Sequence, residues 1–206
     1  MKKNTFSCYW LMACIILFSF VSGCVSVPNS PNPRFYSLHA QDKEKIKKFD
    51  TKVNTIIGVG PVRIPEYLNR PQIIVKKKDK TIVFDEFNRW AESLDFSLER
   101  MLNENLVLML PGTSFQIFPW DFAIAVKYQV VIDIVELENN FNDNLFLAVQ
   151  WSIIDLEKKR AVVTRRSEFS KDIYPHNYYG MVEALSETVS SLSTQVAEEL
   201  VSIKKD

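Results

Sequence analysis

The chain has 206 residues, of which 47% are apolar, and its 25 basic side chains are matched by 25 acidic ones. That length suits one domain with its own core, and the even charge argues against a dedicated nucleic-acid binder, which carries a basic excess. Aromatic residues make up 12% of the chain, which excludes intrinsic disorder. With two His, three Cys and five Gly, the sequence gives little support to a metal site, His-based catalysis or a glycine-rich phosphate loop.

Residues 1–23 have the pattern of a secretory signal peptide. Two lysines stand near the start, an apolar stretch covers residues 10–21, and two small residues precede Cys24. The apolar stretch is about a dozen residues long, whereas a membrane-spanning helix needs about 20, so a permanent transmembrane span is the weaker interpretation. Removal of this segment would leave Cys24 as the only cysteine and a mature chain that is slightly acidic.

The end of that segment, Val21-Ser-Gly-Cys24, resembles a bacterial lipobox. In such signals the Cys thiol receives a diacylglyceryl group, the chain is cut just before it, and the new N-terminus is acylated, typically with palmitate. Several acyl chains give a stable anchor, because each buried CH₂ contributes about 0.8 kcal/mol. We therefore expect lipid attachment at Cys24, with a plain signal peptide as the alternative. Val25, in place of Asp, resembles lipoproteins that are sorted to the outer membrane.

Residues 24–33 form the expected lipidated tether, with three prolines and no charged side chain. Such a segment favours an extended conformation of about 3.1 Å per residue, which would hold a domain about 20–30 Å from a membrane surface. We expect the folded domain to cover residues 34–206.

The first part of that domain predicts strands separated by turns. Residues 34–38 are short and aromatic, and residues 54–64 are β-branched with a bend at two glycines. A turn bounded by prolines follows at 65–71, and a hairpin with a lysine-rich tip joins strands at 72–75 and 81–84.

Two amphipathic helices are predicted at 91–110 and 178–203, because apolar residues recur there at steps of three and four. Between them, further strands are expected at 115–118, 125–138, 145–156 and 161–170, the last three as a meander. The strands at 125–138 and 145–156 carry apolar residues on both faces, which predicts a largely covered sheet. The fold class is therefore α/β or α+β: a single domain with a twisted mixed sheet of about six or seven strands and two main helices packed on it.

The residues do not indicate an enzyme. No P-loop, His-Glu-x-x-His, Cys-x-x-Cys or Gly-x-Ser-x-Gly motif is present. His39 and His176 lack a Ser or Cys partner in a recognisable motif, and the carboxylates around Arg89 are interpreted as a solvated surface. We predict no catalytic residue, no metal ligands and no cofactor.

Three stretches together carry a family resemblance. They are Gly60-Pro-Val-Arg-Ile-Pro-Glu-Tyr-Leu-Asn-Arg-Pro-Gln-Ile-Ile-Val75, Asn88-Arg-Trp-Ala-Glu-Ser-Leu94, and Leu110-Pro111 followed by Phe118-Pro-Trp120. In this order, behind a lipobox, the chain resembles the ABC-type transport auxiliary lipoproteins, above all the paraquat-inducible protein C type. Ser93 departs from the family pattern, which usually has Pro after Ala-Glu.

The resemblance implies a non-enzymatic lipoprotein of the outer membrane that faces the periplasm. Its members are accessory components of MCE-type lipid transport between membranes, and they would dock an MCE-domain protein of the inner membrane at the outer membrane. Ring-like homo-oligomers fit that role. The alternatives are a phospholipid-binding protein with an apolar groove between helices and sheet, and, more weakly, a hydrolase of envelope lipids or glycans.

The candidate partner-binding residues are Tyr67, Leu68 and Arg70 in the proline-bounded turn, and Arg89 and Trp90 before the first helix. Loops commonly carry recognition, and Tyr and Arg are enriched among residues that dominate binding energy. The structural alternative is that Trp90 fastens the helix to the sheet and that Arg70 satisfies loop carbonyls.

Overall fold

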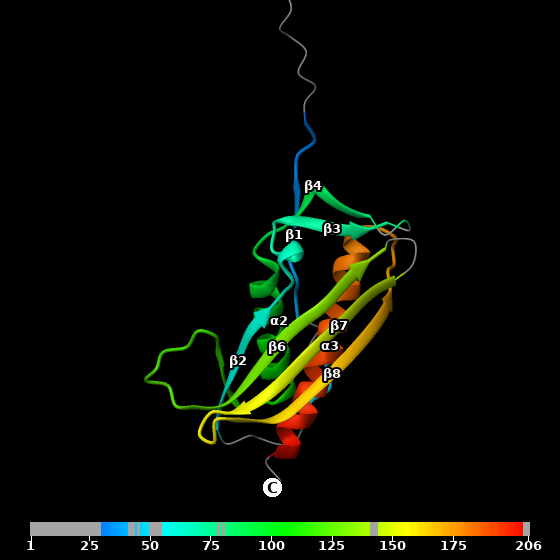
Figure 1. The fold of residues 1–206 in the computed structure, drawn as a ribbon. Coiled ribbons are helices and arrows are strands. Elements are labelled where there is room, and N and C mark those ends of the chain that lie inside the picture. Colours follow the sequence, from blue (N-terminus) through cyan, green and yellow to red (C-terminus); the bar gives the residue numbers. More distant parts are fainter. Residues whose placement is uncertain are drawn as a thin grey trace, which may run out of the picture. The chain divides into compact units, whose positions relative to one another are not determined.

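The computed structural model describes residues 30–40, 44, 46–49, 55–77, 79, 81–140 and 144–203. The expected signal peptide, Cys24 and most of the expected tether lie outside the described residues. From Pro33 onward the described residues belong to one unit with its own hydrophobic core. Figure 1 shows the elements of this unit.

Two helices and eight strands make up the described part of this unit, together with one 3₁₀ turn, and the expected α/β class is confirmed. The helices are α2 (Leu94–Met109) and α3 (Tyr178–Ile203), and the 3₁₀ turn is η1 (Glu66–Leu68). The strands are β1 (Arg34–Tyr36), β2 (Ile56–Arg63), β3 (Gln72–Lys76), β4 (Ile82–Trp90), β5 (Ser114–Ile117), β6 (Val126–Asn139), β7 (Asn144–Asp155) and β8 (Arg160–Asp172).

The strands divide between two mixed sheets instead of lying in the one sheet that we expected. The larger sheet has the order β5-β2-β6-β7-β8, in which β5, β2 and β6 are parallel and the other pairs antiparallel. The smaller sheet has the order β1-β4-β3. Pro65 and Pro71 bound the segment that leads from β2, which ends at Arg63 in the larger sheet, to β3, which begins at Gln72 in the smaller one.

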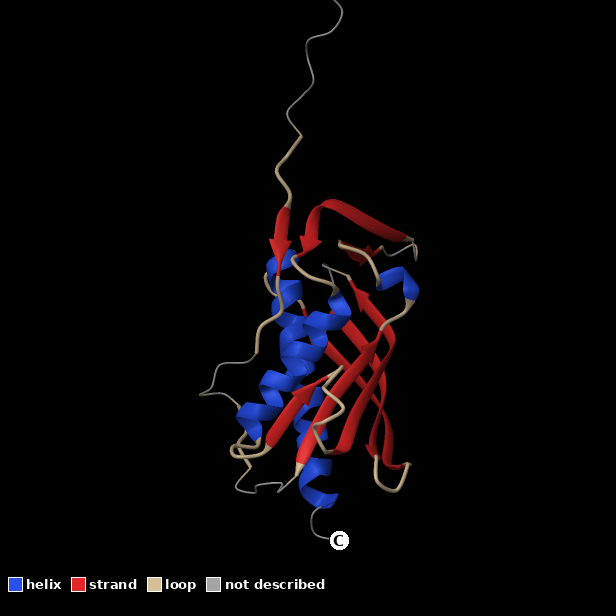
Figure 2. Cartoon of the chain, turned by 90° about the vertical axis from the view of Figure 1, so that its left-hand side faces the viewer, coloured by secondary structure: helices blue, strands red, loops and turns tan. Residues whose placement is uncertain are grey.

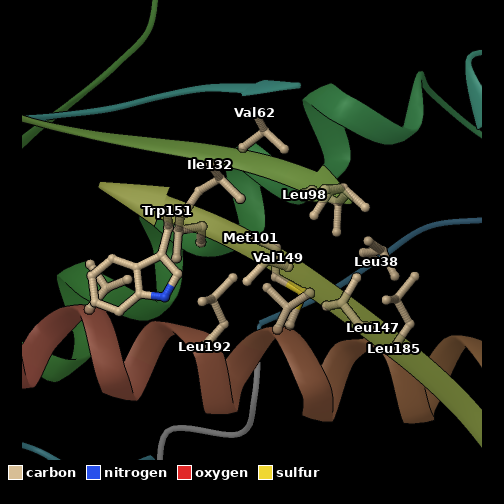
Figure 3. Packing of buried hydrophobic residues seen from close by; sticks show 14 of the residues in the cluster. Leu38, Val62, Leu98, Met101, Ile132, Leu147, Val149, Trp151, Leu185 and Leu192 are labelled. Carbon is tan, nitrogen blue, oxygen red and sulfur yellow. The ribbon is translucent and has the colours of Figure 1, made fainter. Parts of the chain in front are cut away.

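The core lies between one face of the larger sheet and the two helices, which cover that face together (Figure 2). Leu98 and Met101 of α2 and Leu185 and Leu192 of α3 are buried there. They lie near residues that alternate along β7, including Leu147, Val149 and Trp151 (Figure 3). The apolar residues whose spacing predicted the helices are therefore the side chains that hold the helices on the sheet.

The other face of the larger sheet is partly covered, which corrects the expectation of a largely covered sheet. Val131 and Ala148 are buried on this face, but Val135 and Gln150 are exposed. Both described helices pack on the opposite face, so apolar residues on this side of β6 and β7 did not require a second helical layer.

A close contact between β2 and α2 sets the path of the first family stretch. Gly60 has a φ of +104°, and a Cβ there would lie 2.3 Å from Oε2 of Glu99. The buried Glu99 carboxylate accepts a hydrogen bond of 3.1 Å from the Val62 backbone N–H. Burial raises the pKa of Glu99, the Val62 bond opposes the rise, and the nearby Asp95 adds to it. Only glycine meets both the backbone and the space requirement at position 60.

We predict that Glu99→Gln stabilises the protein near neutral pH. The folded state raises the pKa of Glu99 above its ordinary 4.5, so the folded state binds this proton more tightly than the unfolded chain. The wild-type protein therefore loses stability as rising pH ionises the buried carboxyl, whereas glutamine stays neutral and keeps an acceptor for Val62.

Thermal unfolding at about pH 7 and about pH 4 would test this prediction. The variant should melt higher near neutral pH, and its advantage should disappear in acid. Glu66→Gln, at an exposed carboxylate of η1, is the control and should show no such pH dependence. A difference for Glu99→Gln that is the same at both pH values would contradict the prediction.

Candidate docking surface

The turn η1 joins the two sheets and fixes Tyr67. Its backbone closes with a 2.9 Å bond from the Leu68 N–H to the Pro65 carbonyl. Tyr67 is half-buried, and its hydroxyl is hydrogen-bonded to the backbone of Leu137 in β6. Burial raises the pKa of Tyr67, the Leu137 bond opposes the rise, and the nearby Glu136 adds to it. The proline-bounded turn is thus held on the end of β6.

Arg70 is one of the exposed residues of the proline-bounded turn, and it packs on an aromatic ring. Its guanidinium carbon lies 4.2 Å from the centroid of the Phe84 ring in β4. Such cation–π contacts contribute about 0.5–1 kcal/mol at exposed sites. The contact orients the guanidinium and leaves it open to solvent. The structural alternative had Arg70 donating hydrogen bonds to loop carbonyls instead.

Arg89 belongs to a polar cluster between β3 and β4. Its Nε donates to the Glu86 carbonyl at 2.8 Å, and its Nη2 donates to Glu86 Oε2 at 3.0 Å. Gln72 Nε2 lies 3.3 Å from both Glu86 carboxylate oxygens. We call the set Arg70, Gln72, Phe84, Glu86 and Arg89 the docking face.

Leu68 and Trp90, the remaining candidates, are core residues. Both side chains are buried in the hydrophobic cluster, so they offer a partner little surface. The backbone N–H of Trp90 donates to the Pro71 carbonyl at 2.7 Å, and the next N–H, of Ala91, donates to the Tyr36 carbonyl at 2.8 Å. These backbone bonds fasten the end of β4 to the residues that precede β3 and to β1.

A bend in β4 depends on Asp85. Its Oδ1 accepts the backbone N–H groups of Phe87 and Asn88 at 2.8 and 3.0 Å. The segment before the bend pairs antiparallel with β3, and the segment after it pairs parallel with β1. The register with β3 jumps at the bend, from Asp85 to Arg89 on β4 for one step on β3. The carboxylate thereby stabilises the backbone where the register with β3 shifts.

The same carboxylate ties the small sheet to α3. Asp85 Oδ2 accepts a 2.6 Å hydrogen bond from the Tyr178 hydroxyl. The Tyr36 hydroxyl donates to Asn88 Oδ1 at 2.9 Å, and the rings of Tyr36 and Tyr178 lie 5.9 Å apart. We call Tyr36, Asp85, Asn88 and Tyr178 the β4 node.

The node shifts the pKa values of its two acids in opposite directions. Burial favours a higher pKa for Asp85, but hydrogen bonds from Tyr178, Phe87 and Asn88 outweigh it and hold the pKa below the usual range. Burial and the Asp85 carboxylate raise the pKa of Tyr178. Sequence reasoning placed Asp85 in a solvated cluster and missed the node, although an Asp that bonds to the backbone two residues on is a known turn signal.

The described residues hold no group of three or more metal-ligating side chains. His39 Nε2 lies 3.3 Å from the Glu183 carboxylate, and the His176 ring stands edge-on to Tyr174. None of the described helices has the length and apolar character to cross a membrane. The docking face itself consists of aromatic, amide and charged side chains that contact one another.

Comparison with known proteins gives a family and a fold. A model of the ABC-type transport auxiliary lipoprotein component matches residues 36–197. Intermembrane transport lipoprotein PqiC of Escherichia coli K12 is 22% identical over 191 residues, which are 93% of this chain and 96% of that protein. The protein of that name from Shigella flexneri gives the same values.

Solved structures share the fold at low identity. A crystal structure of a Xanthomonas campestris protein has a TM-score of 0.69 and 12% identity, covering 84% of this chain and 98% of that one. The crystal structure of an uncharacterized protein has a TM-score of 0.67 and 19% identity, covering 82% of this chain and 99% of that one. At these identities the likeness supports the fold alone.

We predict that Tyr178→Phe destabilises the protein by about 1.5–3 kcal/mol near neutral pH, because it removes a hydrogen bond to a charged group. The pKa of Asp85 lies below its ordinary 3.8 in the folded state. Its stabilising contribution is therefore present above that ordinary value and lost as the pH falls through the folded one. The cost of the substitution should shrink in acid.

Urea unfolding of the two proteins across that pH range measures the effect. Tyr179→Phe, at the exposed neighbouring tyrosine, should leave the free energy of unfolding unchanged. Equal stability of Tyr178→Phe and the parent near neutral pH would show that the Asp85 contact does not stabilise the fold.

Proposed function

This chain belongs to the ABC-type transport auxiliary lipoprotein family, and we propose that it docks an MCE-domain protein of the inner membrane at the outer membrane. In this role it is a non-enzymatic lipoprotein on the periplasmic face, and several copies form a ring at the end of the partner. The observation that carries the proposal is the family match over residues 36–197, together with a curated relative that is an intermembrane transport lipoprotein.

The proposed anchor is Cys24. The lipobox pattern before it and the proline-rich segment after it are those of a lipidated tether. Because Val25 follows the cysteine, we propose that the chain is retained at the outer membrane. The tether would leave the domain within about 30 Å of the lipid surface, where it can meet a partner that reaches across the periplasm.

The proposed partner contact is the docking face. Arg70 is held on Phe84, and Glu86 is held by Arg89 and Gln72, so these side chains are ordered before any partner arrives. Preordered groups lose less conformational entropy on binding, and exposed Arg and aromatic residues commonly dominate binding energy. These features support a surface that acts through contacts.

The alternative of a lipid groove between helices and sheet gains no support from the described residues. Leu98, Met101, Leu147, Val149 and Leu192 occupy that layer, and all are buried within the hydrophobic cluster (Figure 3). A lipid tail there would have to displace packed side chains, at a cost of several kcal/mol.

We predict that Cys24→Ala abolishes lipidation, because no other thiol remains in the mature chain to accept the diacylglyceryl group. Labelled palmitate should not enter the variant, and the protein should leave the outer-membrane fraction or persist as a precursor. Cys14→Ala, in the expected signal peptide, is the matched control and should still be labelled. Palmitate in Cys24→Ala would refute the anchor assignment.

We further predict that Arg70→Ala weakens binding of the partner's periplasmic region about tenfold, which corresponds to about 1.4 kcal/mol. The substitution removes both the charge and the planar group that lies on Phe84. Arg70→Lys should restore only part of the affinity, because an ammonium cannot reproduce the planar contact.

Surface binding measurements with the purified partner test this prediction. Arg166→Ala is the control: Arg166 is an exposed arginine on β8, away from the docking face, and is paired with Glu168. If Arg70→Ala and Arg89→Ala both bind with the parent's affinity, the docking face is not the contact.

A further inference from the structure

Four aromatic side chains lie exposed around the β4 node, and the docking face does not include them. Tyr174 is 83% exposed, Phe35 62%, Tyr179 61% and Phe87 41%. We call them the aromatic crown. Large aromatic groups that are left in water together on a soluble domain commonly mark an interaction surface.

Three of these exposed groups are next in sequence to residues of the β4 node. Phe35 precedes Tyr36 on β1, and successive side chains of a strand point to opposite sides. Phe87 occupies the turn whose N–H groups bond to Asp85, and Tyr179 follows Tyr178 at the start of α3. Each exposed ring is thus the chain neighbour of a residue that the node holds inward.

Tyr174 joins them because its loop is packed on the start of α3. The Asn177 side chain accepts a 3.0 Å hydrogen bond from the Gly180 N–H. A Cβ at Gly180 would lie 2.0 Å from the Pro175 carbonyl oxygen, so only glycine lets the loop approach this closely. The crown is therefore fixed to β1, β4 and α3 rather than carried on free loops.

We propose that the aromatic crown rests on the lipid surface into which Cys24 is anchored. The domain begins at Pro33, two residues before Phe35 and nine residue steps after Cys24. At about 3.1 Å per step the tether reaches at most about 28 Å, so it keeps this end of the domain beside the membrane. This proposal rests on the anchor proposed above.

The chemistry of the crown fits a membrane interface. Tyr has an apolar ring and a polar hydroxyl and is enriched where acyl chains meet headgroups, and Phe supplies apolar contact at the same depth. The exposed Arg34 beside Phe35 adds a cation that anionic headgroups attract. The tether keeps the crown at a high effective concentration near the membrane. A small free energy of contact is therefore enough to hold the domain in one orientation.

A fluorescent probe on the crown tests the proposal in the full, lipidated protein. The mature chain has no free thiol once Cys24 is acylated, so Tyr179→Cys can be labelled alone with an environment-sensitive dye. The protein is reconstituted in vesicles of phosphatidylethanolamine and phosphatidylglycerol with and without brominated acyl chains. We expect a blue shift of the probe and loss of most of its fluorescence in the brominated vesicles.

Phe122→Cys is the matched control. Phe122 is 99% exposed in the loop between β5 and β6, before the start of β6 (Figure 1). The other end of this 14-residue strand reaches the small sheet, where Asn139 bonds to the Ile74 carbonyl, so about 45 Å separates the two ends. A probe at Phe122 should remain unquenched.

Vesicle flotation, measured in parallel, separates the two proposals. A protein that fails to float overturns the anchor and the crown together, whereas a protein that floats with an unquenched Tyr179 probe overturns the crown alone. Shielding of the probe only after the MCE partner is added would also overturn it and assign the crown to protein contact. Phe35→Ser with Tyr174→Ser should float normally but reduce the quenching, and circular dichroism checks that it stays folded.

Discussion

The carboxylate of Asp85 is the contact on which the arrangement of the small sheet depends. With one oxygen it bends β4, and with the other it accepts the Tyr178 hydroxyl at the start of α3. At the bend the register between β4 and β3 shifts, and the residues after it pair with β1. Phe84, Glu86 and Arg89 of the docking face and Phe87 of the aromatic crown lie on β4, so their positions follow from its path.

The first family stretch, residues 60–75, therefore acts mainly by setting the path of the backbone. Gly60 leaves room for the Glu99 carboxylate, and Pro65 and Pro71 bound the turn that leads from one sheet to the other. Leu68 is buried in the core and Tyr67 is bonded to β6, whereas Arg70 is exposed and lies on the ring of Phe84, where it can meet a partner. One stretch can thus fix the path of the backbone and also present a contact group such as Arg70.

The sequence pattern predicted those elements that depend on apolar spacing within one segment. The helices and the β6–β8 meander follow from apolar spacing within each segment, and their bounds agree with the structure to within a few residues. The division into two sheets did not follow, because it depends on the pairing of residues 88–90 with β1, more than fifty residues earlier in the chain. The β4 node was missed for the same reason: Tyr36, Asp85 and Tyr178 are distant in sequence and meet only in the fold.

Of the candidate contact residues, the sequence identified the right region but could not separate surface from core. Trp90 and Arg89 are adjacent, yet one is buried and the other joins the docking face, because consecutive strand residues point to opposite sides. Arg89 also stands opposite Phe35 of the crown in the β1–β4 register and opposite Gln72 in the β3–β4 register. On the two proposals together, a partner bound at the docking face would end beside the lipid surface, which is where a lipid leaving that partner has the shortest path into the membrane.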